Sequence, residues 1–184
     1  MAGSQARRPQ ATVIGDSDAP PELCSVAEQI GEMLARLGIT VITGGRGGVM
    51  EAACRGAAKA GGTTVGILPS SEMNDANRWC TVVIPTGLGH ARNTVNVLGG
   101  DFVIALGSSA GTLSEVCFAW IHGRPILTVK GYDRWLEQTG SGLDSRRTST
   151  ITECADLESL RKTVVATCGD GWPRITQILA ENDR

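Results

Sequence analysis

The sequence predicts an α/β fold: a Rossmann-like, doubly wound and mostly parallel sheet of about six to seven strands with helices on both faces. Three observations predict it. Short apolar runs alternate with segments of helical periodicity, each run is apolar throughout, and glycine-rich stretches follow several of the runs. Continuous apolar strands are typical of parallel sheets covered on both faces, and right-handed crossovers then produce the doubly wound order.

Three strands and two helices are expected in the first half of the chain. The strands are short and rich in Val, Ile and Thr: residues 11–15, 39–45 and 63–68. Residues 22–38 form the first helix, because apolar residues recur at helical spacing from Leu23 to Leu37 and Gly38 ends the run. The alanine-rich residues 47–62 form the second helix.

The second half continues the alternation and closes with helices. Its strands are residues 80–85, 101–107 and 124–129, with 148–152 as a candidate edge strand. Its helices are residues 87–100, 112–123, 156–168 and 172–182. We therefore expect a flexible tail at residues 1–10 and a single Rossmann-like domain over residues 11–184, which is long enough for one full core.

Composition and charge narrow the class of protein. Charged residues make up 20% and hydrophobic residues 41% of the chain, as in an ordinary globular protein. A net charge of −2 and an aromatic content of 4% argue against a nucleic-acid surface. No run reaches the ~18 apolar residues of a membrane span, and the polar start lacks the apolar core of a secretion signal. We expect a cytoplasmic protein that binds neither nucleic acid nor membrane.

The cysteines are expected to be buried and reduced. There are six, mostly in apolar periodic segments, and no two form a C-x-x-C pair or match a zinc spacing. Free cysteine behaves as a small hydrophobic residue in a reducing compartment. The sequence therefore predicts no metal site.

Glycine-rich loops follow four of the expected strands, where parallel sheets bind their ligands. The stretch TGGRGGVME combines four glycines, which permit close backbone approach, with Arg46 and a helix start. It matches neither G-x-G-x-x-G nor a Walker loop, so we expect a different anion site, with a plain strand–helix turn as the alternative. The candidate ligand-binding residues are Gly15, Asp16, Ser17, Gly44, Gly45, Arg46, Gly47, Gly48, Asn93, Gly107, Ser108, Ser109, Gly111 and Thr112.

Two interpretations of GSSAGTLSE, residues 107–115, stay open. In the first, Thr112 and Glu115 have the T-x-x-E spacing of a capping box, and a glutamate suits the first helical turn. In the second, Ser108, Ser109 and the following backbone surround a phosphate, and Glu115 faces a sugar one turn deeper.

Three stretches together resemble one superfamily: VITGGRGGVMEAACRGAAKAGGTTVGILP, PTGLGHARN and GTLSE. It holds proteins once labelled lysine decarboxylase-like, the lonely-guy cytokinin riboside 5′-monophosphate phosphoribohydrolases, and the molybdenum cofactor carrier proteins. The resemblance covers residues 11–130, and GLGHARN is most similar to the carrier branch. It implies a Rossmann-like fold, a homodimer or homotetramer, and a phosphate-binding P-G-G-x-G-T-x-x-E motif.

The resemblance also implies catalytic residues. In the phosphoribohydrolases an arginine and the motif glutamate are catalytic, and the matching positions here are Arg92 and Glu115. The chain departs from that branch in the phosphate motif and beside the arginine. Leu106 stands where the motif has proline, and Ser108 stands in place of its second glycine. Ala91 and Asn93 replace a glutamate and a lysine beside the arginine.

Two functions follow as alternatives. One is hydrolysis of the N-glycosidic bond of a nucleoside 5′-monophosphate, in which Glu115 stabilises positive charge on the ribose or activates water, and Arg92 holds phosphate or orients Glu115. The other is a carrier that holds the molybdenum cofactor, or another nucleotide-like ligand, as cargo without turnover. A structural oligomer with adventitious phosphate is a third. Neither of the first two requires a resident cofactor.

Lysine decarboxylation is not expected. Pyridoxal chemistry needs a lysine that forms a Schiff base in the site. The lysines are Lys59, Lys130 and Lys162, and none lies in a glycine-rich loop.

Overall fold

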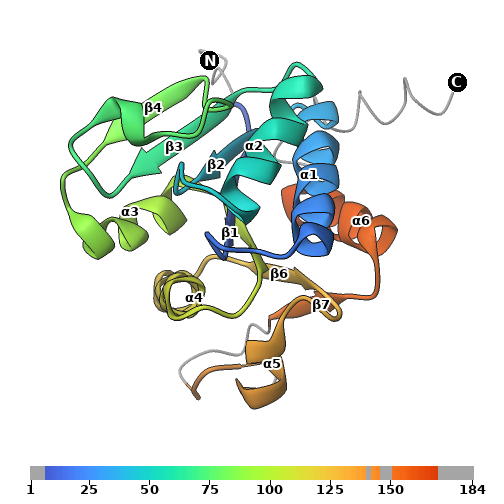
Figure 1. The fold of residues 1–184 in the computed structure, drawn as a ribbon. Coiled ribbons are helices and arrows are strands. Elements are labelled where there is room, and N and C mark those ends of the chain that lie inside the picture. The colour runs from blue at the N-terminus through green and yellow to red at the C-terminus, as the bar shows by residue number, and fades with distance from the viewer. Residues whose placement is uncertain (1–6, 140–141, 146–150, 170–184) are drawn as a thin grey trace, which may run out of the picture.

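The computed structural model describes residues 7–139, 142–145 and 151–169 (Figure 1). Within them, seven strands form one parallel sheet in the order β4-β3-β2-β1-β5-β6-β7. The strands are β1 (Gln10–Gly15), β2 (Thr40–Thr43), β3 (Thr64–Leu68), β4 (Val82–Pro85), β5 (Phe102–Leu106), β6 (Ile126–Val129) and β7 (Thr152–Cys154). The predicted doubly wound α/β class is confirmed.

Helices cover both faces of the sheet (Figure 1). They are α1 (Pro21–Arg36), α2 (Val49–Lys59), α3 (Arg92–Gly99), α4 (Ala110–His122), α5 (Arg134–Thr139) and α6 (Leu157–Cys168), with the 3-10 turns η1 (Met73–Asp75) and η2 (Gly89–Ala91). One core cluster joins α1, α2 and α6 to the sheet, and a second joins α3 and α4. Every residue of β5 is buried, which explains its continuous apolar sequence.

Several boundaries differ from the prediction. Helix α3 begins at Arg92 rather than near residue 87, because Gly87 and Gly89 have φ angles of 64° and 57° and turn the chain first. The last strand is β7, Thr152–Cys154, at the far edge of the sheet, a few residues beyond the candidate at 148–152. The expected helix at 172–182 lies outside the described residues.

The centre of the sheet is where the site is built. Strand β1 pairs with β2 on one side and β5 on the other, so the strand order reverses there. Gly15 pairs with Leu106, the last residues of β1 and β5, so the two following loops start at the same level. Ligands of open α/β sheets bind in the crevice at such a reversal. No helix among the described residues is long and apolar enough to cross a membrane.

Candidate functional site

A pocket of about 360 Å³ lies at the carboxyl ends of β1, β2, β3 and β5. Its lining residues are Gly15, Ser17, Arg46, Met50, Pro69, Gly89, His90, Arg92, Asn93, Ser109, Gly111, Thr112 and Glu115. The pocket therefore collects residues from loops that are far apart in the sequence. Its size is at the lower end of the range of small-molecule sites.

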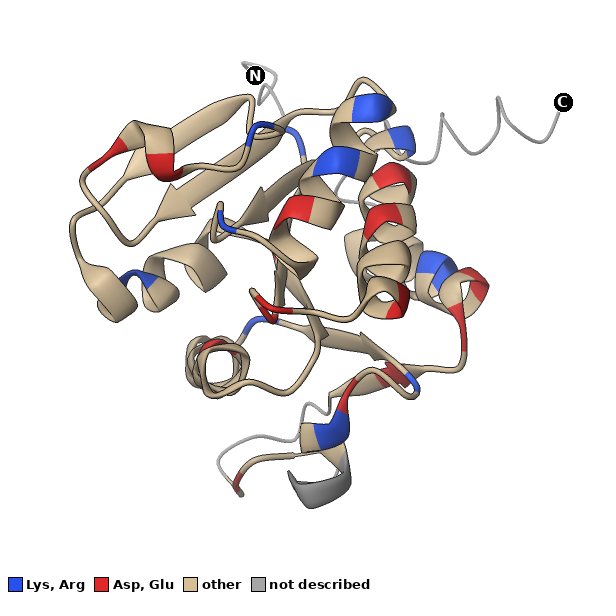
Figure 2. Cartoon of the chain, viewed as in Figure 1, with Lys and Arg blue, Asp and Glu red and all other residues tan. Residues whose placement is uncertain are grey.

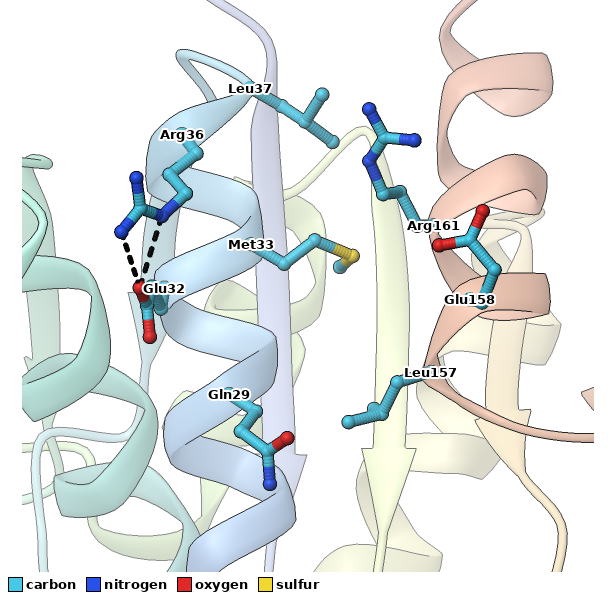
Figure 3. A pocket seen from close by; sticks show the side chains of 8 residues that line it. All are labelled: Gln29, Glu32, Met33, Arg36, Leu37, Leu157, Glu158 and Arg161. Atoms are coloured by element: carbon cyan, nitrogen blue, oxygen red, sulfur yellow. Dashed lines mark hydrogen bonds and ion pairs between the residues drawn. The ribbon is translucent and has the colours of Figure 1, made fainter. Parts of the chain in front are cut away.

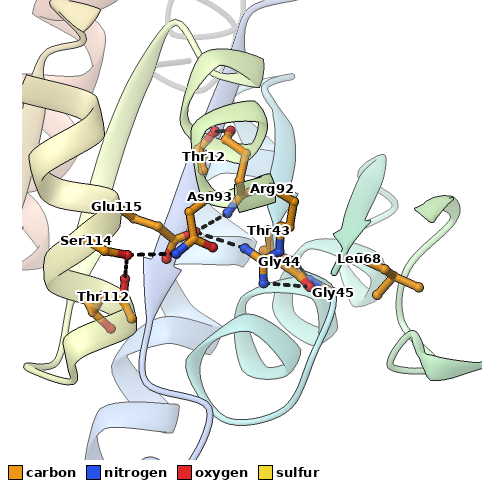
Figure 4. A network of polar contacts seen from close by, with 12 residues as sticks. Thr12, Thr43, Gly44, Gly45, Leu68, Arg92, Asn93, Thr112, Ser114 and Glu115 are labelled. Carbon is orange, nitrogen blue, oxygen red and sulfur yellow. Dashed lines mark hydrogen bonds and ion pairs between the residues drawn. The ribbon is translucent and has the colours of Figure 1, made fainter. Parts of the chain in front are cut away.

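Arg92 and Glu115 form a buried ion pair in this pocket (Figure 4). Arg92 Nη1 donates to Glu115 Oε1 at 3.1 Å, and Asn96 Nδ2, one turn along α3, donates to the same oxygen at 2.7 Å. The two charged side chains are only 9% and 7% exposed. Arg92 Nη2 also reaches the carbonyl of Gly44 at 3.5 Å. The pair thus joins α3 to α4 and touches the loop after β2.

Burial controls the electrostatics of the pair. It raises the pKa of Glu115, and the hydrogen bond from Asn96 and the charge of Arg92 offset only part of that effect. Burial also lowers the pKa of Arg92 against the opposing effect of Glu115, and the positive charge of Arg46 lowers it further. Arg46 is therefore near enough to Arg92 for the two guanidinium groups to repel each other.

Helix α4 begins differently from the first interpretation of its sequence. Ser109 is the N-cap, and its Oγ accepts the Thr112 N–H at 3.3 Å, so the helix starts at Ala110. Glu115 then lies in the second turn and bonds Arg92 and Asn96 instead of the helix start. The capping-box interpretation is wrong for this reason, and Glu115 lies deeper, as the second interpretation expected.

The carboxylate of Asp16 occupies the N-terminal side of α4. It accepts the N–H of Ser108 at 3.0 Å, the N–H of Ser109 at 2.8 Å and the hydroxyl of Thr112 at 2.7 Å. Burial alone would raise the pKa of Asp16, but these hydrogen bonds outweigh it and lower the pKa. The donors that the sequence offered for a phosphate are thus already bound by a carboxylate of the chain itself.

The loop after β2 presents a different environment. Gly48 has a φ of 61°, and a side chain there would collide with the backbone of Asp16 and Ser17, where the two loops cross. Arg46 is exposed, and Asn77 holds its peptide by donating Nδ2 to the Arg46 carbonyl at 3.0 Å. No carboxylate among the described residues pairs with the Arg46 guanidinium, so its charge is free for a ligand.

The structure brings most of the predicted site residues to one place. The predicted residues that line the pocket are Gly15, Ser17, Arg46, Arg92, Asn93, Ser109, Gly111, Thr112 and Glu115. Asn93 is held there by donating Nδ2 to Ser114 Oγ at 2.8 Å. Three others line a neighbouring hollow of about 310 Å³: Asp16, Gly107 and Ser108. The four glycines of the loop after β2 line neither, although Gly44 contacts Arg92.

Four lining residues were not predicted: Met50, Pro69, Gly89 and His90. Gly89 and His90 belong to the GLGHARN stretch, so their place before a site arginine was a usable signal. No such signal marked Met50 and Pro69, because an apolar residue in a helix or next to a strand is expected to lie in the core. No group of three or more His, Cys, Asp or Glu within the described residues is placed to hold a metal ion.

A larger hollow of about 810 Å³ lies between α1 and α6 (Figure 3). Three of its charged residues lie in pairs along their own helices: Arg36 pairs with Glu32 at 2.7 Å, and Glu158 lies 3.7 Å from Lys162. No predicted site residue and no strand end contributes to it. We therefore take the smaller pocket as the candidate functional site.

The chain is similar to a known family and to several solved structures. A model of the SLOG cluster4 family matches residues 8–161. The molybdenum cofactor binding protein of Rippkaea orientalis is 34% identical, with a TM-score of 0.76, over 86% of this chain and 96% of that one. The molybdenum cofactor carrier protein of Chlamydomonas reinhardtii is 29% identical, with a TM-score of 0.73, over 95% and 99% of the two chains.

Two further proteins match this chain, one in its sequence and the other in its fold alone. An uncharacterized protein of Archaeoglobus fulgidus is 38% identical over 121 residues, which are 66% of this chain and 80% of that protein. DNA processing protein A of Helicobacter pylori is 16% identical, with a TM-score of 0.64 over 85% of this chain and 80% of that one, and shares the fold alone.

Proposed function

The chain belongs to the SLOG cluster4 family, and from this premise we propose that it binds the molybdenum cofactor, or a related phosphorylated pterin, as cargo. The predicted resemblance to the carrier branch is confirmed by the solved structures that it matches. The proposed binding site is the pocket at the carboxyl ends of β1, β2, β3 and β5.

The observation that carries the proposal is the free guanidinium of Arg46 at the mouth of this pocket. Arg46 and Arg92 carry two positive charges, and Glu115 carries one negative charge when it is ionised. The Asp16 carboxylate bonds the lining residues Ser109 and Thr112, so the positive part of the pocket is the side that holds Arg46, where the start of α2 adds the positive end of a helix dipole. A phosphate ester suits this combination, because a planar guanidinium binds phosphate oxygens with two hydrogen bonds.

The rest of the lining suits a flat ring attached to that phosphate. Met50 and Pro69 offer apolar surface, and the exposed side chains of Ser17 and His90 offer hydrogen-bonding groups. A phosphorylated pterin needs such a mixture, since its ring is planar and polar at its edges. The ligand would bind with its phosphate toward Arg46.

Hydrolysis of a nucleoside 5′-monophosphate remains the second candidate, and Glu115 favours it. One carboxylate oxygen of Glu115 is held by Arg92 and Asn96, while Oε2 has no hydrogen-bond partner among the described residues. A buried carboxyl group with a raised pKa suits proton donation to a leaving base. The two candidates share the binding site and differ in turnover.

Equilibrium dialysis and product analysis separate the candidates. The wild-type protein is incubated without oxygen with molybdenum cofactor released from a molybdoenzyme, and separately with adenosine 5′-monophosphate. We expect retention of the cofactor and recovery of the nucleotide intact. Release of free adenine that Glu115→Gln abolishes would replace the carrier proposal with hydrolysis, and no retention of either ligand would overturn both.

We also propose that the chain forms a homo-oligomer through α3 and α4. Val95, Leu98 and Ile121 are exposed apolar residues on these helices. Apart from Arg92 and Glu115, which pair with each other, residues 81–100 and 102–123 contain no Lys, Arg, Asp or Glu (Figure 2). A two-fold contact sets one surface against itself, so a surface without charge avoids repulsion.

Light scattering on the purified protein tests the assembly. The wild type should have at least twice the mass of one chain, and Val95→Glu should reduce it. Met73→Glu is the matched control, because Met73 is exposed and apolar but lies on η1. A monomeric wild type would contradict this proposal and leave the ligand experiment unaffected.

A further inference from the structure

Cys54 and Cys80 lie side by side although they are 26 residues apart in the sequence. Their Sγ atoms are 3.9 Å apart, and both thiols are free. Cys54 is buried on α2, and Cys80 is half-buried just before β4. Burial alone, which the sequence predicts for every cysteine, does not account for two thiols in contact.

The fold holds the two sulfurs together next to β3, where helix α2 meets the segment before β4. Gly66, in the middle of β3, leaves the space: a side chain there would meet Cys80 Sγ at 2.7 Å. Thr64 and Thr81 exchange hydrogen bonds at 2.8 Å and 2.9 Å, which fixes the chain next to Cys80. The hydroxyl of Thr43 on β2 lies 3.3 Å from Cys54 Sγ. The contact is therefore built into the sheet.

We propose that Cys54 and Cys80 are a redox modification site, at which hydrogen peroxide converts the two thiols into a disulfide. A disulfide has an S–S distance of about 2.05 Å, so the sulfurs must approach each other by about 2 Å. Rotation of the two side chains and a small shift of the segment before β4 supply this movement. Among the described residues, this is the one hydrogen-bonding contact between two cysteine sulfurs.

The chemistry proceeds in two steps. Cys80, the less buried of the two residues, attacks hydrogen peroxide through Sγ: an S–O bond forms, the O–O bond breaks, and the thiol proton leaves with the second oxygen as water. Cys54 Sγ then attacks Cys80 Sγ: the S–S bond forms, the S–O bond breaks, and the hydroxide takes the Cys54 proton and leaves as water. Two thiols and one peroxide thus give one disulfide and two waters.

Electrostatics support Cys54 as the sulfur that closes the disulfide. The hydrogen bond from Cys80 lowers the pKa of Cys54, burial opposes it, and the hydroxyl of Thr43 lowers it further. The same contact raises the pKa of Cys80, which makes the first step the slower one.

The modification is connected to the loop that carries Arg46. Cys80 N–H donates to the Asn77 carbonyl at 3.2 Å. Asn77 in turn donates its N–H to Gly45 at 2.8 Å and its side-chain amide to Arg46 at 3.0 Å. Drawing Cys80 toward α2 shifts this turn and the Arg46 peptide. We expect the disulfide to weaken anion binding several-fold, a consequence that rests on the proposed function.

Mass spectrometry tests the modification itself. The full chain is treated with excess hydrogen peroxide, its remaining thiols are alkylated, and the intact mass and peptides are measured. We expect a loss of two hydrogens and a Cys54–Cys80 linked peptide pair, which reducing agent reverses. Cys80→Ser and, independently, Cys54→Ala abolish the link, whereas Cys117→Ser on α4 leaves it, with circular dichroism checking that each variant is folded.

Other products would overturn the proposal. Conversion of Cys80 to sulfinic or sulfonic acid without a link, or links that join Cys24 or Cys117 instead, show that the pair does not close. Binding of inorganic phosphate is then measured in the reduced and linked forms. Equal phosphate affinities of the two forms would refute only the coupling to Arg46 and would leave the modification standing. No phosphate binding in either form would count against the proposed function and leave the mass result standing.

Discussion

Two loops at the same edge of the sheet differ in what their backbone and side chains bind. Residues 44–48 follow β2 and residues 107–109 follow β5, and each loop leads into a helix. At the second loop the Asp16 carboxylate takes the N–H groups of Ser108 and Ser109. At the first, no described carboxylate reaches Arg46. Glycines in such loops show that something approaches the backbone closely, but not whether it is a ligand or another part of the chain.

The difference assigns a role to each loop. The loop after β5 is held from within, which fixes the start of α4 and so the position of Glu115 in the next turn. The loop after β2 presents an unpaired cation to the pocket. We therefore expect substitutions that disturb the Asp16 contacts of the loop after β5 to change stability. Substitution of Arg46 in the loop after β2 should change binding.

The largest effect is expected at Arg92. Arg92→Met leaves the Glu115 carboxylate buried without its cation, which should lower the free energy of unfolding by about 3–5 kcal/mol. Urea denaturation measures it. Arg36→Met is the control, because Arg36 forms an exposed ion pair with Glu32 and should cost at most about 1 kcal/mol. Equal losses would show that the Arg92–Glu115 pair is not the structural centre of the pocket.

Replacing Asp16 should reduce stability less than replacing Arg92 does, and it should strengthen phosphate binding. Asp16→Ala removes the acceptor of three hydrogen bonds and should cost about 1–2 kcal/mol. It also frees the amides of Ser108 and Ser109, so inorganic phosphate should bind this variant more tightly than the wild type, by calorimetry. Asp18→Ala, at an exposed neighbour, should change neither property. Weaker phosphate binding to Asp16→Ala would mean that Asp16 supports the anion site rather than filling it.

The two acids should give stability profiles of opposite sign with pH. The folded state lowers the pKa of Asp16, so its contribution is present above about pH 4, the unfolded value, and is lost as pH falls through the folded value. The folded state raises the pKa of Glu115, so stability falls as pH rises through that value. Unfolding across pH should show the acid-side slope shrink in Asp16→Asn. The loss of stability with rising pH should shrink in Glu115→Gln. The opposite result, in which each variant changed the slope assigned to the other acid, would reverse the assignment.

Arg46 should have the smallest effect on folding. Arg46→Ala should leave the free energy of unfolding within about 0.5 kcal/mol, since the side chain is exposed and unpaired. The affinity for a phosphorylated ligand should fall about tenfold, or about 1.4 kcal/mol, through the lost charge-assisted hydrogen bonds. Arg36→Ala serves as the matched surface control in the same dialysis experiment. An unchanged affinity would remove the difference between the two loops.

Local patterns in the sequence determined much of this protein. Apolar runs such as FVIAL and the helical spacing of Leu23 to Leu37 were sufficient for a parallel sheet covered on both faces. Glycines after the strands marked the edge where the pocket lies, three stretches together indicated the superfamily, and GLGHARN indicated its carrier branch. These features are readable because strand and helix periods, and the carboxyl-end rule, are set by residues close together in the chain.

Only the tertiary structure decided which side chains meet. Asp16 and Ser108 are 92 residues apart, Arg92 and Glu115 are 23 apart, and Cys54 and Cys80 are 26 apart. No periodicity spans such separations, because each contact depends on the strand order and on which loops cross at the centre of the sheet. For that reason the T-x-x-E spacing suggested a helix cap, whereas packing of α3 against α4 made Glu115 half of a buried ion pair.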